Sequence, residues 1–588
     1  MPPRTHAAPL LLLALLPTLA TAWDIVRDHK PAAAILLPNP TPPPVQTAAD
    51  ELTNYLFQIT GAHLPVSSQP VPGLKTIRLG TPVKNTKPDE IRLKITSPDT
   101  LELTGDQPRG TLYAVYELLD RLGCRFWSPR QSTIPKQPTI SLPDTLDYAY
   151  APPFRWRQAY GEPSLDYRWA VRNRLNGGYW GQPNIPPAWG QSYAIDVGET
   201  LTLRWVKSKA HFANHPEWYA YRNRSKKREP GQLCMTNPEV RARLLEEVRD
   251  YLHKHPETET LSLCGNDSDQ YCQCTNGCDR LTQTHGTYAA QLVDMANFVA
   301  SSLEREFPRV RYIILAYWTT FGAPKGMKLH PQVEVCCAHL RDFSRTAEED
   351  AYYRDGLYRW RDLAPNKRLW IWDYNACFTD FITALPQFRP IGANMRFYRS
   401  LGVQGFVCQM PWGSCADWVD LRGWLWGRMA WNPDLDEARE IDSWIDGTMG
   451  SGAPYMKRQL AAIEAACKGH CGPYAVTAFV KSWLSTNAPL ALTCLDLQNQ
   501  ALAATVNEPE DHATIERQSA ALLDALIRAY RPLAKRLEGA PRQLPPRAEL
   551  IDRLEAIFTK HKCSTYREWD MPVNLIKAMR KEDFGIKE

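Results

Sequence analysis

The stretch TLSLCGNDSD (residues 260–269) joins a short apolar run directly to a cluster of polar residues. The same pattern, an apolar run followed by polar or aromatic residues, recurs in RYIILAYW (311–318), QVEVCC (332–337), RLWIWDY (368–374) and QGFVCQ (404–409). Helical patterns lie around these runs, near residues 239–253, 287–306, 348–363 and 392–401. Strands that alternate with helices indicate a parallel sheet with helical crossovers, and about 280 residues suit one (β/α)8 barrel of TIM type.

The regions on either side of this barrel have different patterns. Residues 23–150 combine two amphipathic helices, ADELTNYLFQITG (49–61) and RGTLYAVYELLDRLG (109–123), with short strand-like runs, and Gly61 is a natural end for the first helix. The Pro-rich residues 135–153 read as a linker. The predicted fold is therefore α/β, with a small α/β domain (23–150), a barrel domain (151–431) and an α-helical domain (432–588).

The N-terminus has the pattern of a secretory signal peptide over residues 1–22. Arg4 supplies a positive charge, residues 10–16 form a short apolar run, and Ala20-Thr21-Ala22 fits a cleavage site. The run is too short to span a membrane, and we expect no transmembrane segment elsewhere. The 588 residues carry a net charge of +5 without a basic block, so we expect no nucleic-acid partner. The chain is expected to be exported.

Candidate site residues follow the predicted strands, because the chemistry of such barrels lies at the carboxyl ends of their strands. Carboxylates perform acid–base chemistry, amides bind hydroxyl groups, and flat rings stack on sugars. Each residue also has a purely structural explanation: Asn-Asp is a common turn, a Trp often belongs to the core, and Asp373 could pair with Arg368 or Arg396. The candidates are Asn266, Asp267, Tyr317, Trp318, His339, Trp372, Asp373, Tyr374, Gln409 and Trp412.

The chain contains 15 cysteines, and four of them lie close together in sequence: Cys264, Cys272, Cys274 and Cys278. These residues could bind zinc, but the last three are spaced C-x-C-x3-C, unlike the paired C-x2-C of structural zinc sites. In an exported protein, a disulfide within this loop is the favoured interpretation. We therefore assign no metal and no cofactor.

Five segments resemble the central domain of glycoside hydrolase family 163. They are HPEWYAY (215–221), QLCMTNPEV (232–240), LCGNDSDQYCQC (263–274), LAYWTT (315–320) and LWIWDYNACF (369–378). The resemblance covers roughly residues 154–455. The N-terminal helical segments are similar to the small α/β domain that precedes the barrel in hexosaminidases and α-glucuronidases. Family members are exported bacterial proteins, and those characterised are endo-β-N-acetylglucosaminidases that act on complex N-glycans.

The resemblance implies retaining hydrolysis assisted by the 2-acetamido group of an oligosaccharide or glycan substrate, in the periplasm or outside a bacterium. Asp267 and Asp373 are then the expected catalytic carboxylates, with Asn266 as a substrate contact and Tyr374 as support. His339 stands where the family commonly has a Glu. This departure is compatible with another acid, another substrate or a lack of activity. The competing interpretations are therefore a glycan-binding protein on a degenerate barrel and a glycosidase with another substrate, and, separately, a metal-dependent hydrolase that uses the cysteines or His339.

Overall fold

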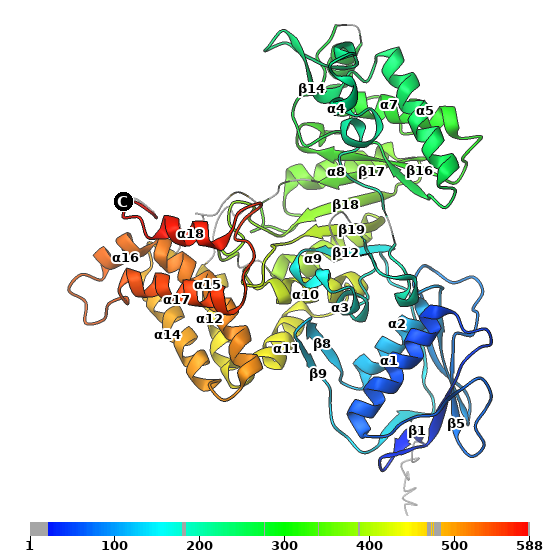
Figure 1. The fold of residues 1–588 in the computed structure, drawn as a ribbon, viewed down its shortest axis with the longest axis vertical. Coiled ribbons are helices and arrows are strands. Elements are labelled where there is room, and N and C mark those ends of the chain that lie inside the picture. The colour runs from blue at the N-terminus through cyan, green and yellow to red at the C-terminus, as the bar shows by residue number, and fades with distance from the viewer. Residues whose placement is uncertain are drawn as a thin grey trace, which may run out of the picture. The chain divides into compact units, whose positions relative to one another are not determined.

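The computed structural model describes residues 22–178, 184–193, 195–275, 277–338, 340, 342–385, 388–466, 472, 474 and 484–585. Nearly all of the predicted signal peptide lies outside these residues, as does His339. The chain divides into two compact units (Figure 1). The first takes the described residues within Met1–Thr86, Glu90–Leu122 and Ile134–Tyr150, and the second takes the rest.

The first unit is an α/β structure with two sheets. Its larger sheet has the strand order β11-β6-β7-β5-β3-β4, and its smaller sheet has the order β10-β1-β2. The strands are β1 (Ala22–Arg27), β2 (Lys30–Pro31), β3 (Ala33–Leu36), β4 (Val66–Ser67), β5 (Lys75–Leu79), β6 (Ile91–Ser97), β7 (Thr100–Gly105), β10 (Ile140–Pro143) and β11 (Asp147–Tyr150). Helices α1 (Pro43–Thr60) and α2 (Gly110–Arg121) pack against each other. Gly61 ends α1 in the left-handed conformation (φ 76°), and its N–H bonds to the Phe57 carbonyl, as the sequence predicts.

The Pro-rich stretch predicted to be a linker is instead part of this unit's sheets. Strand β10 (Ile140–Pro143) pairs with β1 (Ala22–Arg27), and β11 (Asp147–Tyr150) pairs with β6 (Ile91–Ser97). Both strands lie at sheet edges, where a proline that cannot donate a hydrogen bond is tolerated. The linker prediction was wrong because proline content alone does not distinguish an edge strand from a linker.

The second unit is built around a curled sheet of six parallel strands in the order β12-β19-β18-β17-β16-β15 (Figure 1). The first along the chain, β12 (Trp156–Tyr160), has no counterpart in the sequence prediction. The remaining strands are those predicted: β15 (Thr260–Ser262), β16 (Arg311–Tyr317), β17 (Val333–Ala338), β18 (Leu369–Tyr374) and β19 (Val403–Gln409). The described residues thus contribute six strands to this sheet, compared with the eight predicted.

Irregular segments occupy the gap between β12 and β15. The backbone of Gly177 bonds to β12 through the Arg157 carbonyl, and Gly177 forms a parallel bridge with Tyr193. Further along, Glu199 forms a parallel bridge with Cys264, directly after β15. The sheet therefore curls far enough for side chains of opposite strands to meet, and Trp156, Ile313, Cys336, Trp370 and Val407 share one buried cluster.

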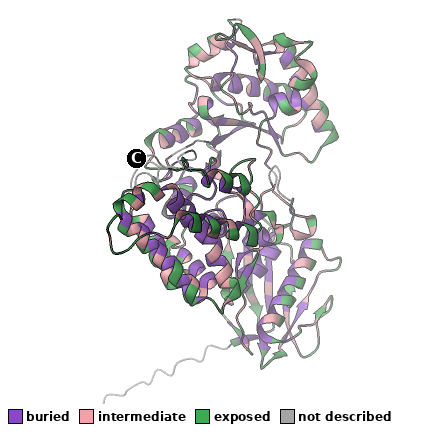
Figure 2. Cartoon of the chain, turned by 60° about the vertical axis from the view of Figure 1, so that its left-hand side comes forward, coloured by how far each residue is buried: buried purple, intermediate pink, exposed green. Residues whose placement is uncertain are grey.

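Helices cover the outer face of this sheet at the predicted places. They are α5 (Pro238–Lys254), α7 (Ala289–Leu303), α8 (Ala351–Leu363) and α9 (Arg389–Ser400). Asn237 caps α5 as expected, because its side chain accepts hydrogen bonds from the N–H groups of Glu239 and Val240. A hairpin of β13 (Tyr219–Arg222) and β14 (Lys227–Leu233) precedes α5. The strands are buried, whereas the helices expose one face to solvent (Figure 2).

The chain after the sheet is helical, as predicted. Helices α14 (Ala488–Ala504), α15 (Pro509–Arg528), α17 (Arg547–Lys560) and α18 (Pro572–Met579) share one apolar core, drawn orange to red in Figure 1. That core also includes Cys377 and Ile382, which follow β18. Within the described part of the chain, no helix combines the length and apolar character needed to cross a membrane.

Candidate active site

A cavity of about 670 Å³ lies at the carboxyl ends of the strands of the curled sheet. Its walls come from β12, β16, β18 and β19, and from the loop after β15. Three parts of the chain that the strand-end argument did not consider also line it: the segment 196–207, Tyr474, and the pair Glu568 and Trp569. Seven predicted residues line it: Asn266, Asp267, Tyr317, Trp318, Trp372, Tyr374 and Gln409. The sheet therefore brings together side chains separated by more than a hundred residues in sequence.

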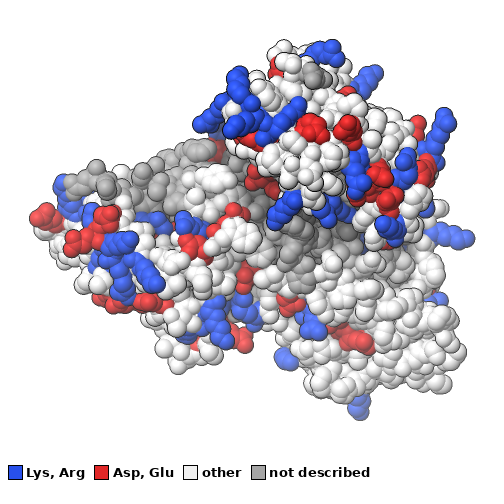
Figure 3. All heavy atoms as spheres, turned by 45° about the horizontal axis from the view of Figure 1, so that its top comes forward, with Lys and Arg blue, Asp and Glu red and all other residues white. Residues whose placement is uncertain are grey.

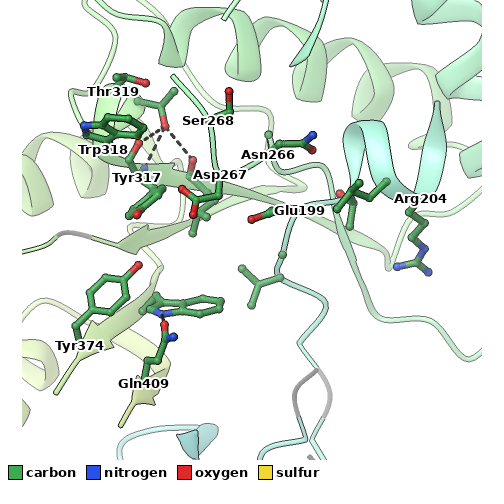
Figure 4. Close-up of a pocket in the computed structure, with 18 of the residues that line it drawn as sticks. Glu199, Arg204, Asn266, Asp267, Ser268, Tyr317, Trp318, Thr319, Tyr374 and Gln409 are labelled. Carbon is green, nitrogen blue, oxygen red and sulfur yellow. Dashed lines mark hydrogen bonds between the residues drawn. The ribbon is translucent and has the colours of Figure 1, made fainter. Parts of the chain in front are cut away.

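Asp267 is exposed to this cavity on the loop after β15 (Figure 4). Gln232, a fully buried residue of β14, hydrogen-bonds to this loop. The Gln232 amide donates to the Asn266 carbonyl at 2.8 Å and accepts from the Asn266 N–H at 3.1 Å. Because both backbone groups of Asn266 are bound, the position of the neighbouring Asp267 is fixed.

Glu199 is a second carboxylate of the cavity, and Figure 4 shows its side chain pointing toward Asp267. Burial raises the pKa of Glu199, and the negative charge of Asp267 raises it further, while a hydrogen bond from the Asp267 backbone opposes both effects. Burial and a neighbouring negative charge both disfavour the ionised form of Glu199, so this carboxyl group keeps its proton to a higher pH than an ordinary glutamic acid.

A third carboxylate, Glu568, lines the same cavity from the segment between α17 and α18. Burial and then the Asp267 charge raise the pKa of this carboxyl group too. Its neighbour Trp569 also lines the cavity, is fully exposed, and has a positive φ of 62°. The C-terminal helical region therefore contributes both a titratable group and an aromatic face.

Two tyrosines lie beside Asp267. Burial and then the Asp267 charge raise the pKa of Tyr317. Burial raises the pKa of Tyr374 as well. Both hydroxyl groups therefore remain protonated at neutral pH, and they supply donors next to a carboxylate.

The indole rings of the cavity differ in exposure. Trp318 follows β16, has a φ of 49° and is 53% exposed, an uncommon state for a bulky residue. Trp372 is half-buried, and its indole N–H donates to Gln409 Oε1 at 3.0 Å. This hydrogen bond orients the Gln409 amide, while Trp318 presents a flat apolar face to the cavity.

Two other predicted residues, Trp412 and Asp373, do not line the cavity. Trp412 packs edge-on against Tyr160 at 5.1 Å and is absent from the cavity lining. His339 lies outside the described residues. Asp373 is 1% exposed on the opposite face of β18, where Tyr398 of α9 donates to its Oδ2 at 2.9 Å. Asp373 faces away from the cavity because side chains alternate along a strand, and Trp372 and Tyr374 take the inner positions.

The cysteines differ from the prediction. Every cysteine among the described residues is a free thiol, so the predicted disulfide in the loop after β15 is not formed. Cys264 belongs to the interior cluster of the sheet, and Cys234 joins Cys272, Cys274 and Cys278 in its place. The sequence argument grouped the cysteines by proximity along the chain and so missed Cys234, which the hairpin brings alongside the loop.

The surface carries both charge signs. Basic and acidic side chains are interspersed on the face seen in Figure 3.

In the cavity wall, Arg204 donates to Asp196 at 2.7 Å, and both residues line the cavity. The cavity wall therefore contains a compensated ion pair in addition to its carboxylates.

Comparisons with known proteins agree with this architecture. Residues 126–461 match the family model described as "Domain of unknown function (DUF4838)", and no curated protein matches the sequence. Among solved structures, the chain is similar to the family GH115 4-O-methyl-α-glucuronidase BtGH115A, which has specificity for decorated arabinogalactans. That match has a TM-score of 0.61 at 13% identity and covers 96% of this chain and 81% of the other.

Two further similar structures are also glycoside hydrolases. CpGH84B matches with a TM-score of 0.48 at 11% identity, covering 92% of this chain and 93% of its own. The family 89 enzyme CpGH89 from Clostridium perfringens, bound to its substrate GlcNAc-α-1,4-galactose, matches with a TM-score of 0.46 at 10% identity, covering 88% and 64%. The likeness to BtGH115A shows a shared fold.

Proposed function

The chain belongs to the DUF4838 family, and from this premise we propose that it is a glycoside hydrolase with its active site in the cavity around Asp267. The observation that carries the proposal is the pairing of Glu199 with Asp267 in one cavity that also exposes indole rings. A carboxylic acid with a raised pKa beside a second carboxylate is the arrangement that glycoside hydrolysis uses. The fold shared with a glucuronidase is consistent with this chemistry.

In this proposal Glu199 is the general acid. Its raised pKa keeps a proton available at a higher pH than an ordinary glutamic acid would. It donates that proton to the glycosidic oxygen as the bond to the anomeric carbon breaks. Such proton transfer contributes roughly 10²- to 10⁴-fold to the rate.

Asp267 is the second carboxylate of the proposed site. For a 2-acetamido sugar, the acetamido oxygen attacks the anomeric carbon while Asp267 accepts a hydrogen bond from the acetamido N–H, as in other substrate-assisted hydrolases. Water then opens the cyclic intermediate and returns a proton to Glu199, which restores the free enzyme. Tyr317, whose protonated hydroxyl group lines the same cavity, supports the charge of this carboxylate.

We extend the proposal to the setting of the enzyme. The curled sheet would be a (β/α)8 barrel in which the segments at Gly177 and at Glu199 take two strand positions. The chain would be exported by a bacterium, because residues 1–22 have the pattern of a signal peptide. Its substrate would be a β-linked N-acetylglucosamine-containing glycan, in line with the family 163 resemblance.

The test is hydrolysis of a panel of complex N-glycans and aryl 2-acetamido-β-glycosides by the full chain. We expect release of reducing sugar, and loss of that release in both Glu199→Gln and Asp267→Asn while far-UV circular dichroism stays unchanged. Full activity in both folded variants would contradict the assignment. A panel of aryl glycosides without the acetamido group identifies a glycosidase with another substrate.

One observation favours a second function, binding of glycans without cleavage. Trp569 is fully exposed and Trp318 is 53% exposed, and both line the cavity, as expected of a stacking surface. Calorimetric binding of the same glycans, with no reducing sugar released during prolonged incubation, would support this function over hydrolysis.

A further inference from the structure

Four buried cysteines meet beside the hairpin that precedes α5. Cys234 directly follows β14, and Cys278 is the first residue of α6 (Cys278–His285). The members of this four-cysteine cluster are Cys234, Cys272, Cys274 and Cys278. Each is at most 5% exposed, and all four sulfur atoms lie within 4.8 Å of one another.

The sulfur–sulfur distances fit a shared metal ion better than a disulfide. The Sγ atom of Cys234 lies 3.6 Å from that of Cys274 and 4.0 Å from that of Cys278. Zinc–thiolate bonds of about 2.3 Å in tetrahedral geometry place sulfur atoms about 3.8 Å apart, whereas a disulfide requires about 2.05 Å. Four thiols with separations near the tetrahedral value form a ready set of ligands.

The surroundings supply polar partners to the sulfur atoms. The Tyr221 N–H donates to Cys272 Sγ at 3.3 Å, and Thr236 Oγ1 lies 3.2 Å from Cys278 Sγ. Arg228 places Nη1 4.0 Å from Cys272 Sγ. A zinc ion with four thiolates has a net charge of −2, so these donors and the Arg228 cation would stabilise it.

The backbone at Gly277 also allows two segments of the cluster to pack closely together. Gly277 precedes Cys278 and has a φ of 138°, and a Cβ at this position would lie 2.9–3.1 Å from the Thr236 side chain. Only glycine allows the loop to pack this closely on the segment that holds Cys234. The fully buried Gln291 then donates to the carbonyl groups of Cys272, at 2.9 Å, and Cys278, at 3.4 Å.

Apolar packing does not explain the cluster. Besides the four cysteines, it contains Ala220, with Tyr221 packed against it. A small hydrophobic site would ordinarily use Leu, Val or Ile, because burying an aliphatic side chain removes more apolar surface from water than burying a thiol.

We propose that the four-cysteine cluster is a structural zinc site. Four protein ligands leave no open position for water or substrate, so the ion would not take part in hydrolysis. Instead it would join the hairpin to the loop after β15, two segments that the chain separates by about 40 residues. The ion would stabilise the fold by linking them.

The site has a consequence for the cavity, and this part rests on the proposed function. Cys234 is two residues from Gln232, which binds the Asn266 backbone, and Cys272 lies five residues after Asp267 in the same loop. A zinc ion would therefore anchor the loop on both sides of Asp267. Loss of the ion should lower kcat through misplacement of this carboxylate.

The decisive measurement is the metal content of the full chain, purified without chelator and without a metal-affinity step. We expect about one zinc ion per chain, released in step with titration of the thiols by a mercurial reagent. Cys272→Ser and Cys274→Ser should each reduce zinc content at least tenfold. Cys264→Ser is the matched control, because Cys264 is equally buried but lies outside the cluster, and it should keep the ion.

If the serine variants do not fold, absorption spectroscopy of the cobalt-substituted wild-type chain still tests the proposal. Protein produced in cobalt-containing medium should show intense thiolate-to-cobalt absorption and the visible bands of tetrahedral cobalt. Less than about 0.1 metal ion per chain, cobalt bands without thiolate character, or two disulfides in place of free thiols would each overturn the proposal. Since none of these readouts involves hydrolysis, failure of the metal site and failure of the proposed function are separate results.

Discussion

The side-chain amide of Gln232 binds both backbone groups of Asn266, donating to the carbonyl at 2.8 Å and accepting from the N–H at 3.1 Å. Gln232 belongs to a hairpin strand outside the curled sheet. Asn266 directly precedes Asp267, the carboxylate in the cavity at the carboxyl ends of the sheet's strands. These two hydrogen bonds connect the buried Gln232 to the loop that carries the proposed catalytic residue Asp267.

Gln232→Ala should lower both stability and activity. The substitution leaves the Asn266 backbone groups without their partner, which costs about 1–3 kcal/mol of folding free energy. We expect kcat to fall more than KM changes, because Asp267 loses its fixed position. Chemical denaturation and steady-state kinetics measure the two effects.

The control for this variant is Gln459→Ala. Gln459 is also buried, and it donates to the Cys494 carbonyl at 3.0 Å and to Gln498 at 2.9 Å within the C-terminal helices. This change should reduce stability by a similar amount and leave kcat unchanged. Equal loss of kcat in both variants would refute the positioning role of Gln232.

Glu199→Gln should remove the alkaline limb of the pH–activity profile. The acid must be protonated to act, so wild-type activity should fall as the pH rises through the pKa of Glu199, which burial and the Asp267 charge raise above its ordinary value. Glutamine cannot titrate, and we expect a roughly 10²- to 10⁴-fold lower kcat without that limb.

The variant Glu568→Gln tests which of the two carboxyl groups with raised pKa values, Glu199 or Glu568, is the general acid. If Glu199 is the acid, this variant keeps the alkaline limb of the profile. Loss of that limb in Glu568→Gln, with retention in Glu199→Gln, would transfer the role to Glu568.

Asp373→Asn should leave activity within a few-fold of wild type. Asp373 is buried behind the strand, where its Oδ2 accepts from the Tyr398 hydroxyl group and its Oδ1 accepts from the Tyr374 N–H, each at 2.9 Å. Asparagine still accepts a hydrogen bond through its amide oxygen but lacks the charge, so stability should fall by about 1 kcal/mol. Activity as low as that of Asp267→Asn would restore Asp373 as a catalytic candidate.

Trp318→Ala and Trp569→Ala should weaken glycan binding. Each ring presents an exposed face in the cavity, and loss of one stacking contact costs about 0.5–1.5 kcal/mol, a roughly 2- to 13-fold rise in KM or Kd. Tyr352→Ala is the matched control, since Tyr352 is 61% exposed but does not line the cavity. Calorimetry with a complex N-glycan measures all three.

Strand-end reasoning predicted much of the cavity because it depends on local pattern. An apolar run predicts a buried strand, and parallel strands bring the residues that follow them to one edge. Asn266, Tyr317 and Gln409 meet for this reason. Asp373 was placed in the same group although the alternation of side chains puts it opposite Trp372 and Tyr374, a signal already present in RLWIWDY.

The sequence by itself determined the alternation of strands and helices, the cap at Asn237 and the carboxylate Asp267, because periodicity and capping are local properties. Only the tertiary structure decided which distant groups join them. Glu199 lies on an irregular segment, Glu568 and Trp569 come from beyond the sheet, and Cys234 reaches its partners through the hairpin. No local sequence pattern predicts that these residues come together, because their positions depend on how the sheet curls and on where the C-terminal helices pack.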